Sequence, residues 1–207
     1  MPFLIRPAGR IRYQVTGAGQ PPLLLTHGFP ATSATFGPSL ARLASRYRVV
    51  TWDMLGHGGS DSPAAPHGYG AAAVVADMAA LLNAEDIDRA VVAGHSLGGY
   101  LSSEFTLAYP ERVLALILID TVPGYRSDSS RASHNAGAER IAARIERLGL
   151  SAVESGALDA RGRASGCSGP CHGRTAHAHP ARRACYGWIA RHCRADEPPG
   201  GLRYLSD

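Results

Sequence analysis

Short apolar runs alternate with longer segments whose apolar residues recur at spacings of three and four over the first 150 residues. Four runs bounded by turn residues predict buried strands: Leu23–Thr26, Arg48–Asp53, Arg89–Ala93 and Val113–Ile119, with a weaker strand at 10–16. The spaced segments predict helices at 32–46, 70–83, 100–109 and 135–149. Strands that alternate with helices of this length are typical of βαβ units, and the runs are apolar enough for a parallel sheet covered on both faces. The predicted fold class is α/β.

This pattern fails in the last quarter of the chain. Between Arg161 and Gly201, Ile189 is the only Val, Ile, Leu, Met or Phe, so no strand or amphipathic helix is predicted there. The charge changes in the same region: residues 1–160 hold 13 Arg against 14 acidic residues, whereas residues 161–207 hold 8 Arg against 3. The basic excess therefore belongs to the tail, and we expect no nucleic-acid partner. A frame change in GC-rich coding would produce such a tail, and we expect it to form no part of the core.

The sequence also indicates in which cellular compartment the protein works and whether it binds a metal. The N-terminal residues lack the long apolar stretch of a signal peptide, and no run approaches the roughly 18 apolar residues of a membrane span. We therefore expect a cytoplasmic protein without a membrane partner. The cysteines all lie in the tail, at positions 167, 171, 185 and 193. Their spacing does not match a paired zinc motif, and neither a metal nor an organic cofactor is predicted.

The strongest chemical motif is Gly94-His95-Ser96-Leu97-Gly98, a G-x-S-x-G segment between a predicted strand and a predicted helix. A sharp strand-to-helix turn exposes its central side chain, and it needs small neighbours because the strand and helix backbones pass close together. The N-terminus of the helix supplies amides and positive potential for a developing oxyanion. Ser96 is the predicted nucleophile, and the Leu97 amide is the predicted first oxyanion donor. A glycine turn that only packs, or one that binds phosphate, remains an alternative.

Two further motifs end the two preceding strands. His27-Gly28-Phe29-Pro30 follows the first apolar run, and the Phe29 amide is the predicted second oxyanion donor. Asp53 opens the segment D-M-L-G-H-G-G-S-D, in which Asp53 and His57 are expected to hold the turn by hydrogen bonds instead of serving catalysis. Ligands of such sheets bind at the carboxyl ends of the strands, so the three motifs should converge.

In combination, HGFP at 27–30, DMLGHGGS at 53–60 and GHSLGG at 94–99 resemble the α/β-hydrolase superfamily, over about residues 8–150. The chain looks like its serine esterase, enol-lactonase and cofactor-free haloperoxidase-like members. Epoxide hydrolases and haloalkane dehalogenases share the HG-x-P segment but carry Asp as nucleophile, so Ser96 argues against both. The resemblance implies a mostly parallel, doubly wound sheet, here without its usual C-terminal part. It divides the chain into a hydrolase core at 1–125, the start of a helical cap at 126–160 and an atypical tail at 161–207.

The resemblance also implies a Ser–acid–His triad in that chain order. The chain departs from the family here, because no late G-x-x-D strand or G-H segment follows residue 150. Asp120, which ends the strand after the nucleophile helix, is a substitute candidate for the acid; the alternative is a structural carboxylate. No histidine stands out as the base among His95, His134 and the tail residues His172, His177, His179 and His192.

The predicted function is hydrolysis of a small ester, lactone or similar acyl substrate through an acyl-enzyme on Ser96. The alternative is a truncated or non-catalytic hydrolase-like protein without a functional triad. Because the base is not identifiable, we expect slow acylation at best, and the missing strands should leave an exposed sheet edge and poor solubility. The sequence predicts neither the substrate's identity nor the oligomeric state.

Overall fold

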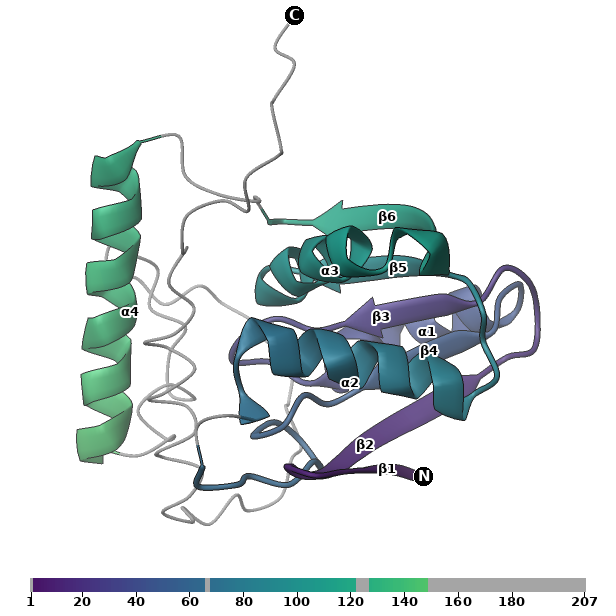
Figure 1. Ribbon diagram of the computed structural model, residues 1–207, viewed down its shortest axis with the longest axis horizontal. Coiled ribbons are helices and arrows are strands. Elements are labelled where there is room, and N and C mark those ends of the chain that lie inside the picture. Colours follow the sequence, from purple (N-terminus) through teal and green to yellow (C-terminus); the bar gives the residue numbers. More distant parts are fainter. Residues whose placement is uncertain (1, 66–67, 122–126, 149–207) are drawn as a thin grey trace, which may run out of the picture. The chain divides into compact units, whose positions relative to one another are not determined.

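The computed structural model describes residues 2–65, 68–121 and 127–148 (Figure 1). The chain forms two compact units, Met1–Pro123 and Gly124–Asp207. The first unit holds the whole sheet. In the second unit the described element is a helix, α4 (Asp128–Leu148). The predicted boundary between core and cap falls in the segment 122–126, and the whole predicted tail, 161–207, lies beyond residue 148, so both predictions lie outside the described residues.

The first unit is built on a six-stranded sheet with the order β1-β2-β4-β3-β5-β6. The pairs β4–β3, β3–β5 and β5–β6 are parallel, whereas β1–β2 and β2–β4 are antiparallel. This confirms the predicted α/β class and the mostly parallel sheet. The strands are β1 (Phe3–Arg6), β2 (Gly9–Thr16), β3 (Leu23–Thr26), β4 (Val49–Trp52), β5 (Ala90–His95) and β6 (Val113–Ile119).

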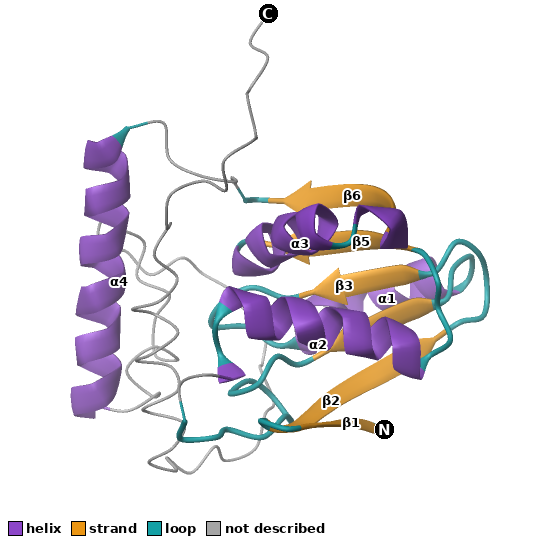
Figure 2. Ribbon diagram, viewed as in Figure 1, coloured by secondary structure: helices purple, strands orange, loops and turns teal. Residues whose placement is uncertain are grey.

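Helices cover both faces of this sheet (Figure 2). They are η1 (Ser33–Phe36), α1 (Gly37–Ala44), α2 (Ala71–Ala84), α3 (Leu97–Ala108) and η3 (Pro110–Arg112). Leu23 and Leu25 of β3 form one core cluster with Phe36, against which Leu40 and Leu43 of α1 pack. On the other side lie α2 and α3, whose apolar stripes are buried. Every residue of β3 and β4 is buried, as the continuous apolar runs predicted.

Two elements differ from the expectation. The short run Phe3–Arg6 is an edge strand that the sequence pattern did not predict, because four residues with two exposed apolar side chains carry little periodic signal. The last helix was expected to place Ile141 and Ile145 on one buried stripe. Ile145 is fully buried, but Ile141 is 43% exposed, and the helix begins earlier, at Asp128.

β6 lies at the end of the strand order, so within the described residues it pairs on one side only, with β5. Its side chains on both faces are partly or largely exposed. The exposed edge expected from the sequence concerns strands after residue 150, outside the described residues, and stays a prediction. In the part of the chain that the structure describes, no helix combines the length and hydropathy that crossing a bilayer would require.

Candidate active site

The three motifs singled out in the sequence meet at one edge of the sheet. Thr26, the last residue of β3, is in register with Trp52 of β4 on one side and with Gly94 of β5 on the other. The segments that follow these strands therefore leave the sheet next to one another. Trp52 strengthens this junction by donating its indole N–H to the hydroxyl of Thr26, at 3.1 Å. The predicted convergence at the carboxyl ends of the strands is confirmed.

Ser96 lies on the turn between β5 and α3 in a backbone conformation that few residues adopt. Its φ is +52° and its ψ is −120°, in a region that L-residues avoid because of steric crowding. Such a conformation costs on the order of 1–3 kcal/mol and persists only where the surroundings enforce it. The Ser96 amide donates to the carbonyl of Ile119 in β6, and the Ser96 carbonyl accepts from the amides of Gly99 and Tyr100. The backbone on both sides of the turn is thus fixed by hydrogen bonds.

The glycines on either side of Ser96 allow this turn to pack against its neighbours. A Cβ at Gly94 would overlap the carbonyl oxygen of Gly98, and a Cβ at Gly98 would overlap the carbonyl oxygen of Thr26. Backbone from three segments therefore passes within contact distance, which only residues without a side chain permit. The sequence analysis predicted that the positions two residues before and after Ser96 must be small, and this close packing is the reason.

The backbone of the HGFP segment lies directly against Ser96. A Cβ built on Gly28 would be 3.0 Å from the Cβ of Ser96 and 2.8 Å from the carbonyl oxygen of His95. Phe29 follows Gly28, and its ring meets the ring of His57 edge-on, with centroids 6.1 Å apart. Leu97 is the first residue of α3, where amides have no partner within the helix. The two predicted oxyanion donors thus belong to segments that flank Ser96, and their orientation toward its hydroxyl stays a prediction.

The candidate acid Asp120 follows β6 at a φ of +47°. Its side chain is 92% exposed, and its Oδ2 lies 4.0 Å from Nε2 of His95. His95 Nδ1 is buried, and among the residues that the structure describes it has no hydrogen-bond partner. The role of Asp120 in a triad stays a prediction, and the tail histidines lie outside the described residues.

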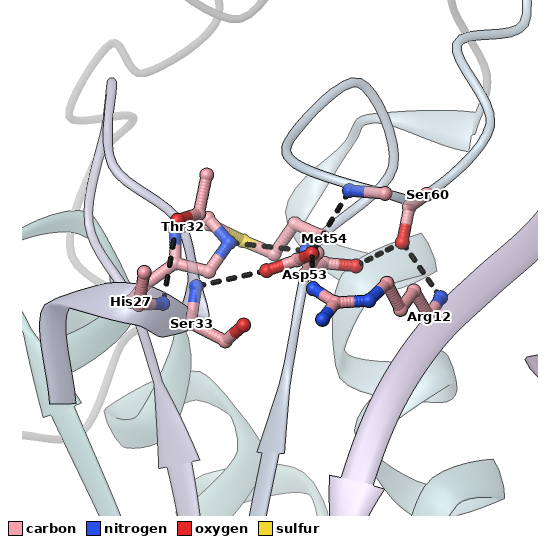
Figure 3. Close-up of polar contacts among 9 residues, drawn as sticks. Arg12, His27, Thr32, Ser33, Asp53, Met54 and Ser60 are labelled. Atoms are coloured by element: carbon pink, nitrogen blue, oxygen red, sulfur yellow. Dashed lines mark hydrogen bonds and ion pairs between the residues drawn. The ribbon is translucent and has the colours of Figure 1, made fainter. Parts of the chain in front are cut away.

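The second motif is held by Asp53, which has no exposed side-chain surface (Figure 3). Its carboxylate accepts hydrogen bonds from the amides of Ser33 and Gly59 and from the guanidinium of Arg12, at 2.8, 2.9 and 2.8 Å. Burial alone would raise the pKa of Asp53, but these donors outweigh it and lower the pKa below the ordinary value. The structural role expected for Asp53 is confirmed.

Three members of this network were not singled out in the sequence. Arg12 comes from β2, Ser33 from the start of η1, and Ser60 accepts from the Arg12 amide at 2.8 Å while donating to the Asp53 carbonyl. Arg12 and Ser33 lie 41 and 20 residues from Asp53 along the chain, so no local pattern indicates their contacts, whereas Ser60 belongs to the DMLGHGGS motif itself. Only the antiparallel pairing of β2 with β4 brings Arg12 to this turn.

Residues 21–166 match the family model described as the alpha/beta hydrolase fold. The chain belongs to the α/β-hydrolase-fold family. This match and the motifs at the strand ends agree, so the resemblance inferred from HGFP, DMLGHGGS and GHSLGG is confirmed.

Curated relatives of this α/β hydrolase include several hydrolases. It is 36% identical over 135 residues to 2-(acetamidomethylene)succinate hydrolase of Mesorhizobium japonicum, covering 63% of this chain and 48% of that protein. It is 35% identical over 112 residues to epoxide hydrolase 4 of Mus musculus, covering 54% of this chain and 31% of that protein. The chain thus spans about a third to a half of the length of these relatives.

Solved structures give the same fold. A thermophilic esterase from Thermogutta terrifontis matches with a TM-score of 0.64 and 24% identity, over 92% of this chain and 68% of that one. An N-acyl homoserine lactone degrading enzyme matches with a TM-score of 0.57 and 27% identity, over 70% of this chain and 56% of that one. The fold that positions Ser96 is therefore shared with known hydrolases.

His27 is buried beside this site, and both of its ring nitrogens form hydrogen bonds with backbone groups. Nδ1 lies 2.8 Å from the carbonyl oxygen of Gly28, and Nε2 lies 3.1 Å from the amide nitrogen of Met54. Because an amide can only donate, Nε2 is the acceptor and Nδ1 carries the proton. Burial lowers the pKa of His27, against opposing contributions from the Gly28 carbonyl and from Asp53. Neutral His27 therefore ties the HGFP segment to Met54, in the turn that follows β4.

A pH dependence of stability follows from this lowered pKa. In the unfolded chain His27 binds a proton near pH 6.5, whereas the folded state resists protonation, so stability is full above pH 6.5 and falls below it. We expect His27→Gln, which keeps an acceptor for Met54, to flatten the fall between pH 6.5 and 5 by up to about 1.4 kcal/mol per pH unit. Urea unfolding at a series of pH values measures this slope. Parallel curves for the two proteins would contradict the prediction.

Proposed function

We propose that this chain is a serine hydrolase that acts on a small ester, lactone or similar acyl substrate. Ser96 Oγ attacks the carbonyl carbon and releases its proton to water, and the tetrahedral oxyanion is stabilised by the amides of Phe29 and Leu97. Collapse of this intermediate breaks the bond to the leaving oxygen, which takes up a proton, and leaves an acyl-enzyme. Water then attacks the acyl carbon, releasing the acid and restoring Ser96. No cofactor enters this scheme.

The observation that carries the proposal is the strained backbone of Ser96 at the junction of β5 and α3. The strained backbone of a serine between a strand and a helix N-terminus costs stability, and such strain is concentrated at functional sites. The helix adds a dipole that favours negative charge at this end. Gly28 brings a second backbone segment within contact distance of Ser96 Cβ. Together these features support attack on a carbonyl better than the binding of a phosphate or simple packing.

The substrate class rests on the identity of the nucleophile and on similar proteins. A serine forms an acyl-enzyme with carbonyl substrates, whereas the resemblance assigns an aspartate to epoxide hydrolases. Two similar structures are named as an esterase and as an enzyme that degrades N-acyl homoserine lactones. We therefore favour an ester or lactone over an epoxide, although epoxide hydrolase 4 is among the similar sequences.

We assign no general base. Both ring nitrogens of His27 are occupied by backbone groups, which excludes it from taking the Ser96 proton. Without a base, the oxyanion hole and substrate binding leave a residual acceleration of about 10³–10⁴-fold over water. Slow acylation is therefore expected of this chain, and a hydrolase-like protein without turnover is the second candidate.

A fluorophosphonate probe tests the proposal, because it reacts with an activated serine and forms a stable adduct. We expect any adduct on the 207-residue chain to lie at Ser96, as located by peptide mass spectrometry, and labelling to fall at least about 100-fold in Ser96→Ala. Ser45→Ala, which removes an exposed hydroxyl at the end of α1, is the matched control and should label like the parent.

The outcomes separate the two candidates. If the Ser96→Ala variant still formed the adduct at the full level, Ser96 would not be the nucleophile. Labelling at Ser96 without hydrolysis of p-nitrophenyl acetate would support the second candidate, a nucleophile without a working triad. Hydrolysis at about 1–10³ s⁻¹, typical of enzymes, would show that a base is present and contradict the expected slow acylation.

A further inference from the structure

The chain leaves β6 through a short segment that touches the serine turn at two places. The carbonyl of Ile119 accepts a hydrogen bond from the Ser96 amide, at 3.0 Å. Two residues later, the side chain of Thr121 packs on Gly99 in the first turn of α3: a Cβ built on Gly99 would overlap Cγ2 of Thr121 and lie 2.8 Å from its Cβ. α3 and β6 are neighbours in the first unit (Figure 1). The exit of β6 therefore borders both the serine and the helix that follows it.

Asp120 bends the chain between these two contacts. Its φ of +47° lies in the left-handed region, which Asp tolerates better than most residues. Its Oδ2 lies 4.0 Å from Nε2 of His95, the residue before Ser96. Strained backbone persists where the surroundings enforce it, and it is concentrated at functional sites. Each of the two segments that meet here thus contains a residue with positive φ, Ser96 in one and Asp120 in the other.

The first turn of α3 is held from two sides. On the β3 side, the obstacle to a Cβ at Gly98 is backbone, the carbonyl oxygen of Thr26. On the β6 side, the obstacle to a Cβ at Gly99 is the side chain of Thr121, which is β-branched and therefore restricted in χ1. A contact with backbone does not depend on the side chain at that position, whereas a contact with a side chain depends on its size. The residue at position 121 therefore sets how closely the start of α3 lies to the end of β6.

We propose that Thr121 is a positioning residue for Ser96 and for the amide of Leu97. As a role in catalysis, this rests on the proposed serine-hydrolase function. An oxyanion donor must lie about 2.7–3.1 Å from the developing charge, and a misplacement of about 1 Å can lower a rate about 100-fold. Without the Thr121 methyl group, the first turn of α3 shifts toward β6 and carries the Leu97 amide away from its place beside Ser96 Oγ. Thr121 acts through Gly99 and the helix turn.

The second-order rate constant for modification of Ser96 by the fluorophosphonate probe tests this role, because it measures the folded chain. We expect Thr121→Ser, which removes only the methyl group, to lower this constant at least about fivefold, and Thr121→Val, which keeps the methyl group, to stay within about twofold of the parent. The matched control is Thr106→Ser, which removes the same group in the last turn of α3 and keeps the hydrogen bond to the Ser102 carbonyl. It should change the constant less than about twofold.

An exchange of size between positions 99 and 121 tests the contact itself. Gly99→Ala places a methyl group where the Thr121 methyl group lies, and should lower the rate constant at least about tenfold. Adding Thr121→Gly empties that space, so the double variant should react at least about threefold faster than Gly99→Ala alone. Effects of the two substitutions that simply add would show that Thr121 does not set the position of the helix turn.

Amide hydrogen exchange gives a readout that does not depend on the proposed function. The Ser96 amide is bonded to the Ile119 carbonyl, and in Thr121→Ser its exchange should quicken at least about fivefold relative to that of Leu24 in the central strand β3. Faster exchange in a chain that the probe does not label would contradict the proposed function and leave the positioning of the serine turn supported. Exchange at Ser96 that changes only in step with Leu24 would show that Thr121 merely packs, and would overturn the proposal.

Discussion

Gly98→Ala is expected to lower the free energy of unfolding by about 3 kcal/mol, the upper end of the usual range for overpacking. A Cβ at position 98 would overlap the carbonyl oxygen of Thr26 and come within 2.5 Å of the carbonyl oxygen of His27. Both obstacles are backbone at the end of β3, so no side chain can rotate away. Relief requires α3 to move off the sheet, which would also disturb the turn at Ser96. Urea unfolding followed by circular dichroism measures the loss.

Gly37→Ala is the matched control, because it makes the same chemical change in a helix with open space. Position 37 has helical dihedral angles, and nothing lies within 4 Å of a Cβ built there. Alanine there should stabilise the chain by about 0.4–1 kcal/mol, since it restricts the unfolded state without native strain. Equal effects of the two substitutions would show that the close approach at Gly98 does not constrain the fold.

The contrast between these glycines illustrates what local sequence can predict. The strands Leu23–Thr26 and Val113–Ile119 were predicted to the residue, because continuous apolar runs bounded by turns have one simple interpretation. The helix after Ser96 was predicted to begin at residue 100 but begins at Leu97. Gly98 and Gly99 have low helix propensity, and the packing that requires them is long-range.

In the site, too, some contacts were predictable from the sequence and others were not. We predicted that the HGFP segment lies beside the serine turn, because the carboxyl ends of parallel strands meet at one edge of a sheet. The register of Thr26 with Gly94 confirms this. The partner of Asp53 did not follow, because Arg12 reaches it through antiparallel pairing of β2 with β4. No local pattern distinguishes Arg12 from the other arginines near the N-terminus.

Asp53→Asn is expected to destabilise the chain by about 3–5 kcal/mol. The substitution keeps the shape but replaces a fully buried carboxylate that accepts from Arg12, Ser33 and Gly59. An amide group has a single acceptor oxygen, so its NH₂ would face at least one of these donors. The Arg12 guanidinium would also lose its charged partner. Thermal or urea unfolding measures the difference, with Asp120→Asn as the control.

The control removes a carboxylate charge that is exposed, so it separates the effect of losing a buried carboxylate from that of losing a charge. Asp120 is 92% exposed, and its φ of +47° is a conformation that asparagine tolerates, so its loss should change stability by less than about 0.5 kcal/mol. The two proteins should also differ in acid. Because the folded pKa of Asp53 lies below its unfolded value of 3.8, its contribution is complete above pH 3.8 and is lost as the pH falls through the folded pKa. Asp53→Asn should lack this acid-induced loss, whereas Asp120→Asn should retain it. A destabilisation by Asp53→Asn no larger than that of Asp120→Asn would show that the Arg12 network does not hold the turn beside Ser96.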